Sequence, residues 1–306
     1  MAVDLVFTKL IFRLRLRSEV RDPYALFSLK IRFREVFRKT VCVSYGGCGA
    51  CSGKGCCPFQ DIFGQGLAVD PEALKRHQKP PLPFIFHPPL VDCRNALNRE
   101  IEIGLVVIGA AMRHLPLFCD AVKKMFSEEP EAGIPVAEIV GLESEGCSGS
   151  RFSIEYESGS VALEGLSTIS AEDLLALNTL PMHFLGMRIL TPMRIPRDGS
   201  FLREFSFSPF FRTLLRRVSS LAYYYHGSVL EMDYQRLARL SDCIDIDRSD
   251  TQWTVWRKGA MEGITGHLAL RGDLSDFHPV LLLGEYFSCG KGASYGLGRY
   301  ELTGYP

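Results

Sequence analysis

The sequence has no apolar run of the roughly 18 residues that a membrane-spanning helix needs. Its longest candidate, "IGLVVIGAAM" at 103–112, has the length of a strand. The first 17 residues, "MAVDLVFTKLIFRLRLR", alternate apolar and basic residues and lack a signal-peptide cleavage pattern. We therefore expect a cytoplasmic protein with no membrane partner.

The sequence also lacks a net charge, because 35 Lys and Arg balance 35 Asp and Glu. A sum of zero argues weakly against nucleic acid, but the charges are segregated along the chain. Residues 1–40 hold ten basic and four acidic residues, 188–217 hold seven Arg and two acids, and 126–146 hold six Glu and no base. Such a chain can present a basic groove, although solvated surface faces are an equally good interpretation.

The ten cysteines do not form the pattern of a disulfide framework, since five fall within 16 residues and the rest are scattered. The clustered five are Cys42, Cys48, Cys51, Cys56 and Cys57. In the cytoplasm such thiols stay reduced. The cluster therefore indicates a chemistry other than disulfide formation.

The first half of the chain predicts the element order β-α-β-β-α-β. Residues 5–17 alternate as a strand that places Ile11, Arg13, Arg15 and Arg17 on one face. Residues 21–41 show helical spacing, with Asp22 as the expected N-cap and Pro23 in the first turn. Strands at 83–89 and 100–110, a helix at 114–128 and strands at 134–145 and 150–159 follow.

The second half repeats this order. We expect a strand at 182–195, helices at 207–227 and 233–242, strands at 251–258 and 262–273, a helix at 278–290 and a closing strand at 297–304. Two such units in tandem predict an α+β protein of two ferredoxin-like domains. Their expected bounds are 1–167, with a Cys-rich insertion at 42–57, and 181–306, with a glycine-rich loop. The linker between them, 168–181, contains a short helix capped by Ser170.

The glycine-rich loop lies in "GEYFSCGKGASYGLGRYEL" at 284–302. A phosphate loop of the Walker type needs four residues between its glycines and a hydroxyl after the lysine. Here five residues separate Gly284 from Gly290, and Gly292 follows Lys291. The dinucleotide-binding fingerprint fails as well, because the remaining glycines have the wrong spacing and no helix can follow them.

A glycine loop can still bind a polyphosphate chain, since absent side chains let backbone N–H groups approach an anion. Lys291 and Arg299 add positive charge, and the loop leads directly into a strand. That position suits RNA lying across a sheet. The alternative is a tight turn before an edge strand.

The same stretch resembles the C-terminal glycine-rich loop of the RAMP (repeat-associated mysterious protein) superfamily, and within it the CRISPR precursor-RNA-processing endoribonucleases. Further stretches agree: "MRILTPMRI", "FFRTLLRRVSSLAYYY" and "GITGHLALRGDL" in the second half, and "PFIFHPP", "IGLVVIGAAMRHLPLF" and "SRFSIE" in the first. The resemblance covers nearly the whole chain and is strongest over 180–304. It implies two ferredoxin-like domains, as the element order does.

The resemblance implies an enzyme that binds CRISPR repeat RNA, both precursor and mature crRNA, and cuts it once without a metal. The 2′-hydroxyl attacks the adjacent phosphate and leaves a 2′,3′-cyclic phosphate. The reaction needs an in-line nucleotide, a base for the 2′ proton, an acid for the leaving oxygen and cations or amides at the phosphorane. Other CRISPR effector subunits are further candidate partners.

The catalytic base is the open assignment. Relatives often place a His between the first helix and the second strand, where this chain offers only His77; His87 follows at the end of the next strand. A His suits acid–base work at neutral pH. Because some relatives use other side chains, Tyr24 and Lys30 also qualify. A solvated loop is the competing interpretation of His77, and a half-buried structural role that of His87.

The resemblance also implies the residues that contact RNA. We expect these to be basic residues on the first strand and on the helix at 207–227, together with the glycine loop: Arg13, Arg15, Arg17, Arg216, Arg217, Gly290, Lys291, Gly292, Gly296, Gly298 and Arg299. Many relatives have a His immediately before the loop lysine. This chain has Gly290 there, so that position supplies no base.

The cysteine cluster has the spacing of a metal knuckle, because Cys48-x2-Cys51 places two thiolates on one turn. Cys42 and Cys57 complete a four-ligand set, with Cys56 as an alternative. Structural zinc, an iron–sulfur cluster and no metal all remain open. No cofactor is expected to act in catalysis.

A second function, from a different class, fits the same motifs. A non-catalytic crRNA-binding subunit of a CRISPR effector complex would keep the fold and the loop but lack an acid–base pair. The absence of His from residues 1–76 favours this alternative.

Overall fold

A computed structural model of the 306-residue chain describes residues 5–42, 48, 51, 57–76, 80–94, 96–127, 134–157, 160–161 and 165–304. The chain divides into two compact units. The N-terminal unit holds Phe7–Leu67 and Leu82–Thr168, and the C-terminal unit holds Met1–Val6, Ala68–Pro81 and Ile169–Pro306. None of the helices in the described part combines the length and the apolar character that crossing a bilayer requires.

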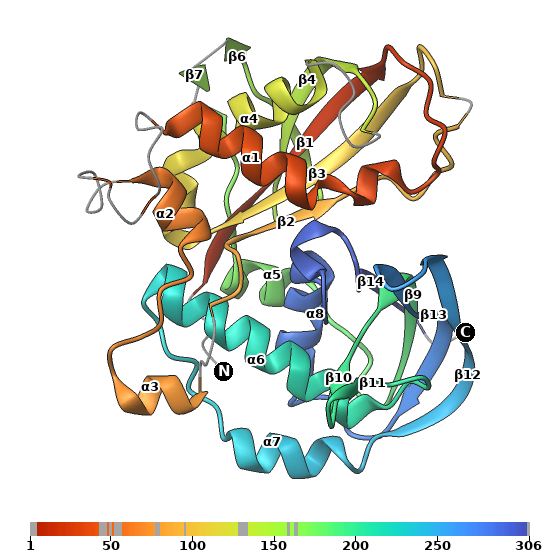
Figure 1. Ribbon diagram of the computed structural model, residues 1–306. Helices are drawn as coiled ribbons and strands as arrows, with labels where there is room; N and C mark the ends of the chain where they lie inside the picture. Colours follow the sequence, from red (N-terminus) through yellow and green to blue (C-terminus); the bar gives the residue numbers. More distant parts are fainter. Residues whose placement is uncertain are drawn as a thin grey trace. The chain divides into compact units, whose positions relative to one another are not determined.

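The N-terminal unit is an antiparallel sheet with helices on one face (Figure 1). Its strands pair in the order β2-β3-β1-β4-β5. The elements are β1 (Val6–Leu16), η1 (Ala25–Phe27), α1 (Leu29–Val41), α2 (Pro58–Phe63), β2 (Phe84–His87), β3 (Glu100–Ile108), η3 (Gly109–His114), α4 (Leu115–Ser127), β4 (Ala137–Glu145), β5 (Arg151–Ser153), β6 (Tyr156–Glu157) and β7 (Ser160–Val161).

The C-terminal unit repeats this arrangement with its strands in the order β12-β13-β9-β14. Its elements are α3 (Pro71–Arg76), β8 (Ile169–Ser170), α5 (Ala171–Leu177), β9 (Phe184–Met193), β10 (Pro196–Arg197), β11 (Ser200–Phe201), α6 (Phe207–His226), α7 (Tyr234–Ser241), β12 (Asp245–Arg257), β13 (Met261–Arg271), α8 (His278–Phe287), η4 (Ala293–Tyr295) and β14 (Tyr300–Thr303). In both units the fourth strand pairs with the first and the third lies between first and second. The prediction of two tandem ferredoxin-like domains is confirmed.

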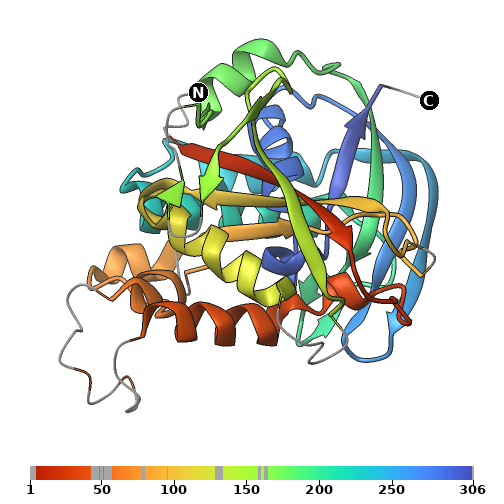
Figure 2. The same ribbon diagram turned by 90° about the horizontal axis from the view of Figure 1, so that it is seen from above.

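An aromatic cluster forms the core of the N-terminal unit. The ring of Phe33, on α1, lies 4.8 Å from Phe86 and 5.2 Å from Phe84 on β2, and 6.0 Å from Phe118 on α4. All four side chains are fully buried. The helices α1 and α4 therefore lie side by side on the sheet, as both ribbon views show (Figure 1, Figure 2).

The expected start of the first helix is wrong. The Asp22 carboxylate accepts the backbone N–H of Tyr24 at 2.9 Å, so Asp22 closes a turn instead of capping a helix. A short 3-10 turn follows, and α1 begins only at Leu29. Arg32, on this helix, is buried.

Other boundaries also differ from those expected. Strand β12 begins at Asp245, six residues before the expected start, and the short β10–β11 hairpin was not predicted. The expected cap of α5 is present, since the Ser170 hydroxyl accepts the Asp173 N–H at 3.0 Å. Of the expected Cys-rich insertion, the structure describes only Cys42, Cys48, Cys51 and Cys57, so the insertion stays a prediction.

Truncating the central ring of the aromatic cluster should destabilise the protein strongly. We expect Phe33→Ala to lower the free energy of unfolding by about 3–5 kcal/mol, because it removes buried contacts and leaves a cavity. Denaturant unfolding followed by circular dichroism measures this change. Ile31→Ala, on the same helix but 67% exposed, is the matched control and should cost less than about 1 kcal/mol. Equal losses for the two variants would contradict the assignment of the core.

Candidate functional site

The glycine-rich loop begins where α8 ends at Phe287 and runs to β14. Its backbone enters the left-handed region repeatedly, with φ of 55° at Ser288, 92° at Gly290, 88° at Gly292, 90° at Gly296 and 68° at Gly298. Side-chain-bearing residues rarely adopt these angles. The glycines therefore define the path of this loop.

Two of these glycines are also required by close backbone contacts. A Cβ atom on Gly298 would lie 1.7 Å from the carbonyl oxygen of Cys289, and one on Gly290 would lie 2.4 Å from that of Arg194. No side chain fits at either position. This explains in physical terms why the residue before Lys291 cannot be a histidine in this chain.

Hydrogen bonds tie the loop to the end of β9. The Gly298 N–H donates to the Pro192 carbonyl at 3.1 Å. The buried Thr191 hydroxyl donates to the Gly296 carbonyl and accepts the Arg299 N–H, each at 2.9 Å. The loop is thus held against the end of β9.

The loop leaves a small set of donors for a ligand. Within the described part of the chain, the backbone N–H groups of Gly290 and Gly292 donate no hydrogen bond. The exposed Lys291 ammonium has no carboxylate within ion-pair distance among the described residues. Two free amides beside a free cation suit an anion such as a phosphate.

Arg194 connects the loop to two neighbouring turns. Its backbone carbonyl accepts the Lys291 N–H at 3.0 Å, and its guanidinium donates to the carbonyls of Gly259 and Ala260 at 3.2 and 3.3 Å. The guanidinium also lies 4.3 Å from the centre of the Phe201 ring, while the Lys291 ammonium lies 5.6 Å from that ring. The loop, the β10–β11 hairpin and the β12–β13 turn thus share one anchor.

Two further groups beside the loop make contacts within the protein. The Arg217 guanidinium donates to the Phe287 carbonyl at 2.9 Å and to the Ser294 hydroxyl at 3.3 Å, and burial lowers its pKa to about 10. Arg217 stays protonated at neutral pH and holds the end of α8. Burial raises the pKa of the Cys289 thiol to about 12, so it carries no nucleophilic thiolate near neutral pH.

The N-terminal strand does not present the free basic face that we expected. Acids on the neighbouring strands pair with its arginines: Arg13 Nε lies 3.6 Å from Glu143, Arg15 lies 2.7 Å from Glu100, and Arg17 pairs with Glu138. The Arg17 hydrogen bond lowers the pKa of the Glu138 carboxyl.

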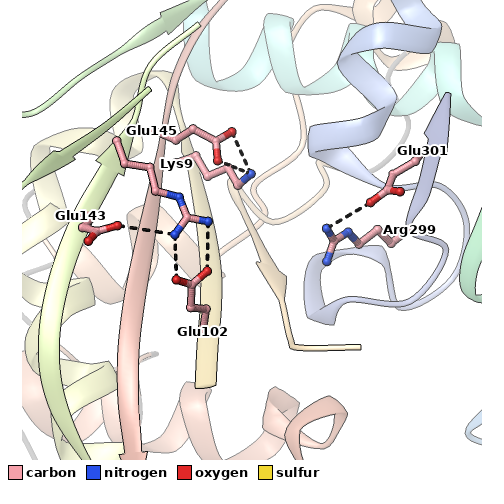
Figure 3. A network of polar contacts seen from close by, with 7 residues as sticks. Lys9, Glu102, Glu143, Glu145, Arg299 and Glu301 are labelled. Carbon is pink, nitrogen blue, oxygen red and sulfur yellow. Dashed lines mark hydrogen bonds and ion pairs between the residues drawn. The ribbon is translucent and has the colours of Figure 1, made fainter. Parts of the chain in front are cut away.

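Further ion pairs between strands extend along the same sheet. Lys9 binds Glu145 at 2.8 Å, as Figure 3 shows, and Arg151 of β5 lies between Glu102 and Glu143 at 2.7 and 3.6 Å. These charges are therefore satisfied within the protein.

The remaining expected RNA contacts fall into two groups. Arg299 lies 3.7 Å from Glu301, an ion pair also drawn in Figure 3. Arg216, on the exposed face of α6, has no acidic partner among the described residues. Among the residues that we expected to contact RNA, Arg216 and Lys291 are thus two cations without a carboxylate partner in the described part of the protein.

The expected catalytic residues are placed as follows. His77 lies outside the described residues. His87 ends β2 opposite Gly104 and is only 5% exposed, so its ring could reach a ribose hydroxyl only after a rearrangement. Tyr24 is half-buried before η1, and Lys30 is exposed in the first turn of α1.

A histidine–carboxylate pair that we did not predict occurs in the N-terminal unit. His114 Nε2, at the end of η3, lies 3.0 Å from Asp61 Oδ2 of α2, and Arg113 donates to the same oxygen at 2.7 Å. An imidazole oriented by a carboxylate is a common acid–base arrangement. The two partners are 53 residues apart, so no local motif signals the pair.

The candidate metal ligands do not form a group in the part of the chain that the structure describes. No cluster of three or more His, Cys, Asp or Glu side chains there could hold a metal ion. Cys42, Cys48, Cys51 and Cys57 are partly exposed, and Cys56 lies outside the described residues. A structural zinc stays a prediction.

Comparison with known proteins matches both halves of the chain. Residues 187–300 match the family model described as CRISPR-associated endoribonuclease Cas6, and residues 5–146 match a second one, described as an N-terminal domain. The first match runs from β9 into β14 and contains the glycine loop with Lys291. None of the curated proteins matches this chain closely enough to count as a relative.

Solved structures share the fold over almost the full length. A Cas6 product complex aligns at 14% identity and a TM-score of 0.58, covering 97% of this chain and 100% of that chain. A Cas6 substrate mimic complex aligns at 13% and 0.55, covering 97% and 99%. Cas6 of Thermus thermophilus aligns at 13% and 0.54, covering 99% and 100%. At such low identity these likenesses show the fold alone.

A side chain at Gly298 should disrupt the loop. We expect Gly298→Ala to destabilise the protein by about 2 kcal/mol or more, because the left-handed φ is strained and the new Cβ collides with Cys289. Gly227→Ala is the matched control, with a φ of 72° but nothing within 4 Å of its Cβ, and should cost only about 1–2 kcal/mol. Urea unfolding of both variants measures the difference. A Gly298→Ala variant no less stable than Gly227→Ala would refute the close contact.

Proposed function

We propose that this chain, a Cas6/RAMP-type protein, is an endoribonuclease that binds CRISPR repeat RNA and cuts it to mature crRNA. The observation that carries the proposal is the match of residues 187–300 to the Cas6 endoribonuclease model, which includes the glycine loop. The ferredoxin-like order of both sheets supports it. Product and substrate-mimic complexes among the similar solved structures fit the same role.

The proposed reaction is a transesterification without a metal. The ribose 2′-oxygen forms a bond to the adjacent phosphorus while the bond from phosphorus to the 5′-oxygen breaks. A base takes the 2′ proton and an acid returns one to the 5′-oxygen, so the products are a 2′,3′-cyclic phosphate and a 5′-hydroxyl.

The glycine loop supplies the phosphate contacts in this proposal. The free N–H groups of Gly290 and Gly292 and the Lys291 ammonium can donate to the oxygens of the RNA backbone. Such donors are already in place before RNA binds, because Thr191 and Arg194 fix the loop. Gly296, Gly298 and Arg217 act indirectly, by shaping the loop.

The base in this proposal is His77, with Tyr24 and Lys30 as alternatives. The burial of His87 argues against that residue. His114, oriented by Asp61, is an additional candidate that only the structure reveals. The mechanism needs one of these side chains within hydrogen-bond reach of the 2′-hydroxyl in the bound complex.

The proposed partners are precursor and mature crRNA, with other CRISPR proteins in addition. One of the similar solved structures is a partial complex described as Cas6-RT-Cas1–Cas2, with a TM-score of 0.58 at 11% identity. The alternative function, a non-catalytic crRNA-binding subunit, keeps the same loop contacts. It is distinguished by the absence of cleavage.

Incubation of the protein with end-labelled repeat RNA in excess EDTA tests the reaction. We expect a single cut that leaves a cyclic phosphate, detected because acid treatment or a phosphatase with cyclic-phosphatase activity changes the mobility of the fragment. Tight binding without any cut would replace the proposal with the non-catalytic subunit. Loss of cleavage in EDTA and its recovery with a divalent ion would contradict metal independence.

Single alanine variants then identify the base. His77→Ala should abolish cleavage while leaving RNA binding intact, and full activity of that variant would remove His77 from the mechanism. His114→Ala, Tyr24→Phe and Lys30→Ala, measured in parallel by single-turnover cleavage, show which alternative takes its place.

Removal of the loop lysine should weaken RNA binding. We expect Lys291→Ala to reduce the slope of log K against log salt by about 0.7–0.9, since one phosphate contact is lost. Lys39→Ala, an exposed lysine on α1, is the matched control and should leave the slope unchanged. Titrations of fluorescent repeat RNA at several salt concentrations measure both slopes. Identical slopes for Lys291→Ala and the unmodified protein would exclude the loop lysine from phosphate binding.

A further inference from the structure

Strand β12 forms an open edge of the C-terminal sheet. In the order β12-β13-β9-β14 it pairs only with β13 within the part of the chain that the structure describes. Figure 1 shows it as the outer strand of that sheet. None of its 13 residues, Asp245–Arg257, is buried, whereas the neighbouring strand β13 buries Leu268, Ala269 and Leu270. An edge strand of this kind offers backbone N–H and C=O groups to a further strand.

Two irregularities bound the regular part of this edge. The register between β12 and β13 shifts between Ile246 and Arg248, and again between Val255 and Arg257. Between these shifts, residues 248–255 pair with β13 without interruption. Such a stretch has an ordinary strand length. A bulge bends its strand and ends regular pairing, so a further strand would pair with this stretch alone.

The charges of β12 are segregated along the strand. Its first six residues hold three Asp and one Arg, whereas the rest of the strand and the residue after it hold two bases, Arg257 and Lys258, and no acid. The Asp245 side chain is 70% exposed, and its ion pair with Arg271 spans 3.6 Å. A second strand of the same sequence meets opposite charges only when it runs antiparallel, because a parallel strand places acid beside acid.

The same strand carries apolar surface of the kind that protein interfaces use. Val255 is 53% exposed. Trp253 and Trp256, the two tryptophans of the chain, are both partly exposed. The Arg203 guanidinium lies 3.9 Å from the centre of the Trp253 ring and helps to hold it in place. Because aromatic residues are enriched at the centres of interfaces, this strand has the composition of a contact surface as well as its open edge.

We propose that β12 pairs with β12 of a second copy of this chain, antiparallel and around a two-fold axis at the middle of residues 248–255. The axis then lies between Thr251 and Gln252, and it brings Asp245 of each copy to the end that carries Lys258 of the other. The two four-stranded sheets join into one continuous sheet, so the edge is closed. The pairing uses no residue of the glycine loop and is independent of the proposed function.

Sedimentation equilibrium of the full chain at several micromolar concentrations tests the pairing. We expect a reversible dimer with twice the mass of one 34.2 kDa chain. Asp245→Lys and Lys258→Glu each bring like charges together twice in a dimer, so each variant should dimerise roughly tenfold more weakly. Both side chains are exposed, so the fold should persist, and a thermal melt verifies this.

Two further measurements sharpen the result. An equal mixture of Asp245→Lys and Lys258→Glu brings opposite charges together again, so the two variants should form a mixed dimer about as stable as that of the unmodified protein. Glu231→Lys is the matched control, because it makes the same change of charge as Asp245→Lys at an exposed loop residue outside β12. It should dimerise like the unmodified protein.

Weaker dimers of both variants, with recovery in their mixture, support the proposed pairing. A chain that stays monomeric at every concentration overturns it. A dimer that both variants leave unchanged also overturns it, since that dimer uses another surface. An equal loss in Glu231→Lys, or no recovery in the mixture, overturns it as well, because either result indicates a general effect of charge. None of these results alters the proposed function, since the experiment contains no RNA.

Discussion

The close contact between the glycine loop and β9 is the constraint on which the candidate site depends. Gly298 and Gly290 pass so near the carbonyls of Cys289 and Arg194 that no side chain fits. This approach allows Gly298 to donate to Pro192 and places Thr191 under the loop. The exposed position of Lys291 follows from that path. The site is therefore built from backbone geometry, with side chains added to it.

The two units differ in how the cations that we expected to contact RNA are compensated. In the N-terminal unit, acids on β3 and β4 neutralise the cations of β1, and RNA could use those arginines only by displacing carboxylates. In the C-terminal unit Lys291 and Arg216 lack such partners among the described residues. A net charge of zero thus conceals a division between paired and unpaired cations. Electrostatic attraction of RNA would depend on the second group.

The sequence predicts the order of the elements well, because apolar periodicity and turn residues are local signals. The pairing of Arg15 with Glu100 is not local: it depends on the register between β1 and β3, which the sequence does not display. The same limit hides the approach of His114 to Asp61. Asp22 misled for another reason, since a turn and a helix cap use the same carboxylate contact. The glycine loop was recognisable because its glycines are each required at a fixed spacing.

Arg194 has a consequence for the energetics of binding. It ties the β12–β13 turn through Gly259 and Ala260, the β10–β11 hairpin through Phe201 and the glycine loop through Lys291. The turn, the hairpin and the glycine loop are therefore ordered together when the protein folds. A ligand that binds at the glycine loop therefore loses less conformational entropy of these segments, and more of its contact energy remains as affinity.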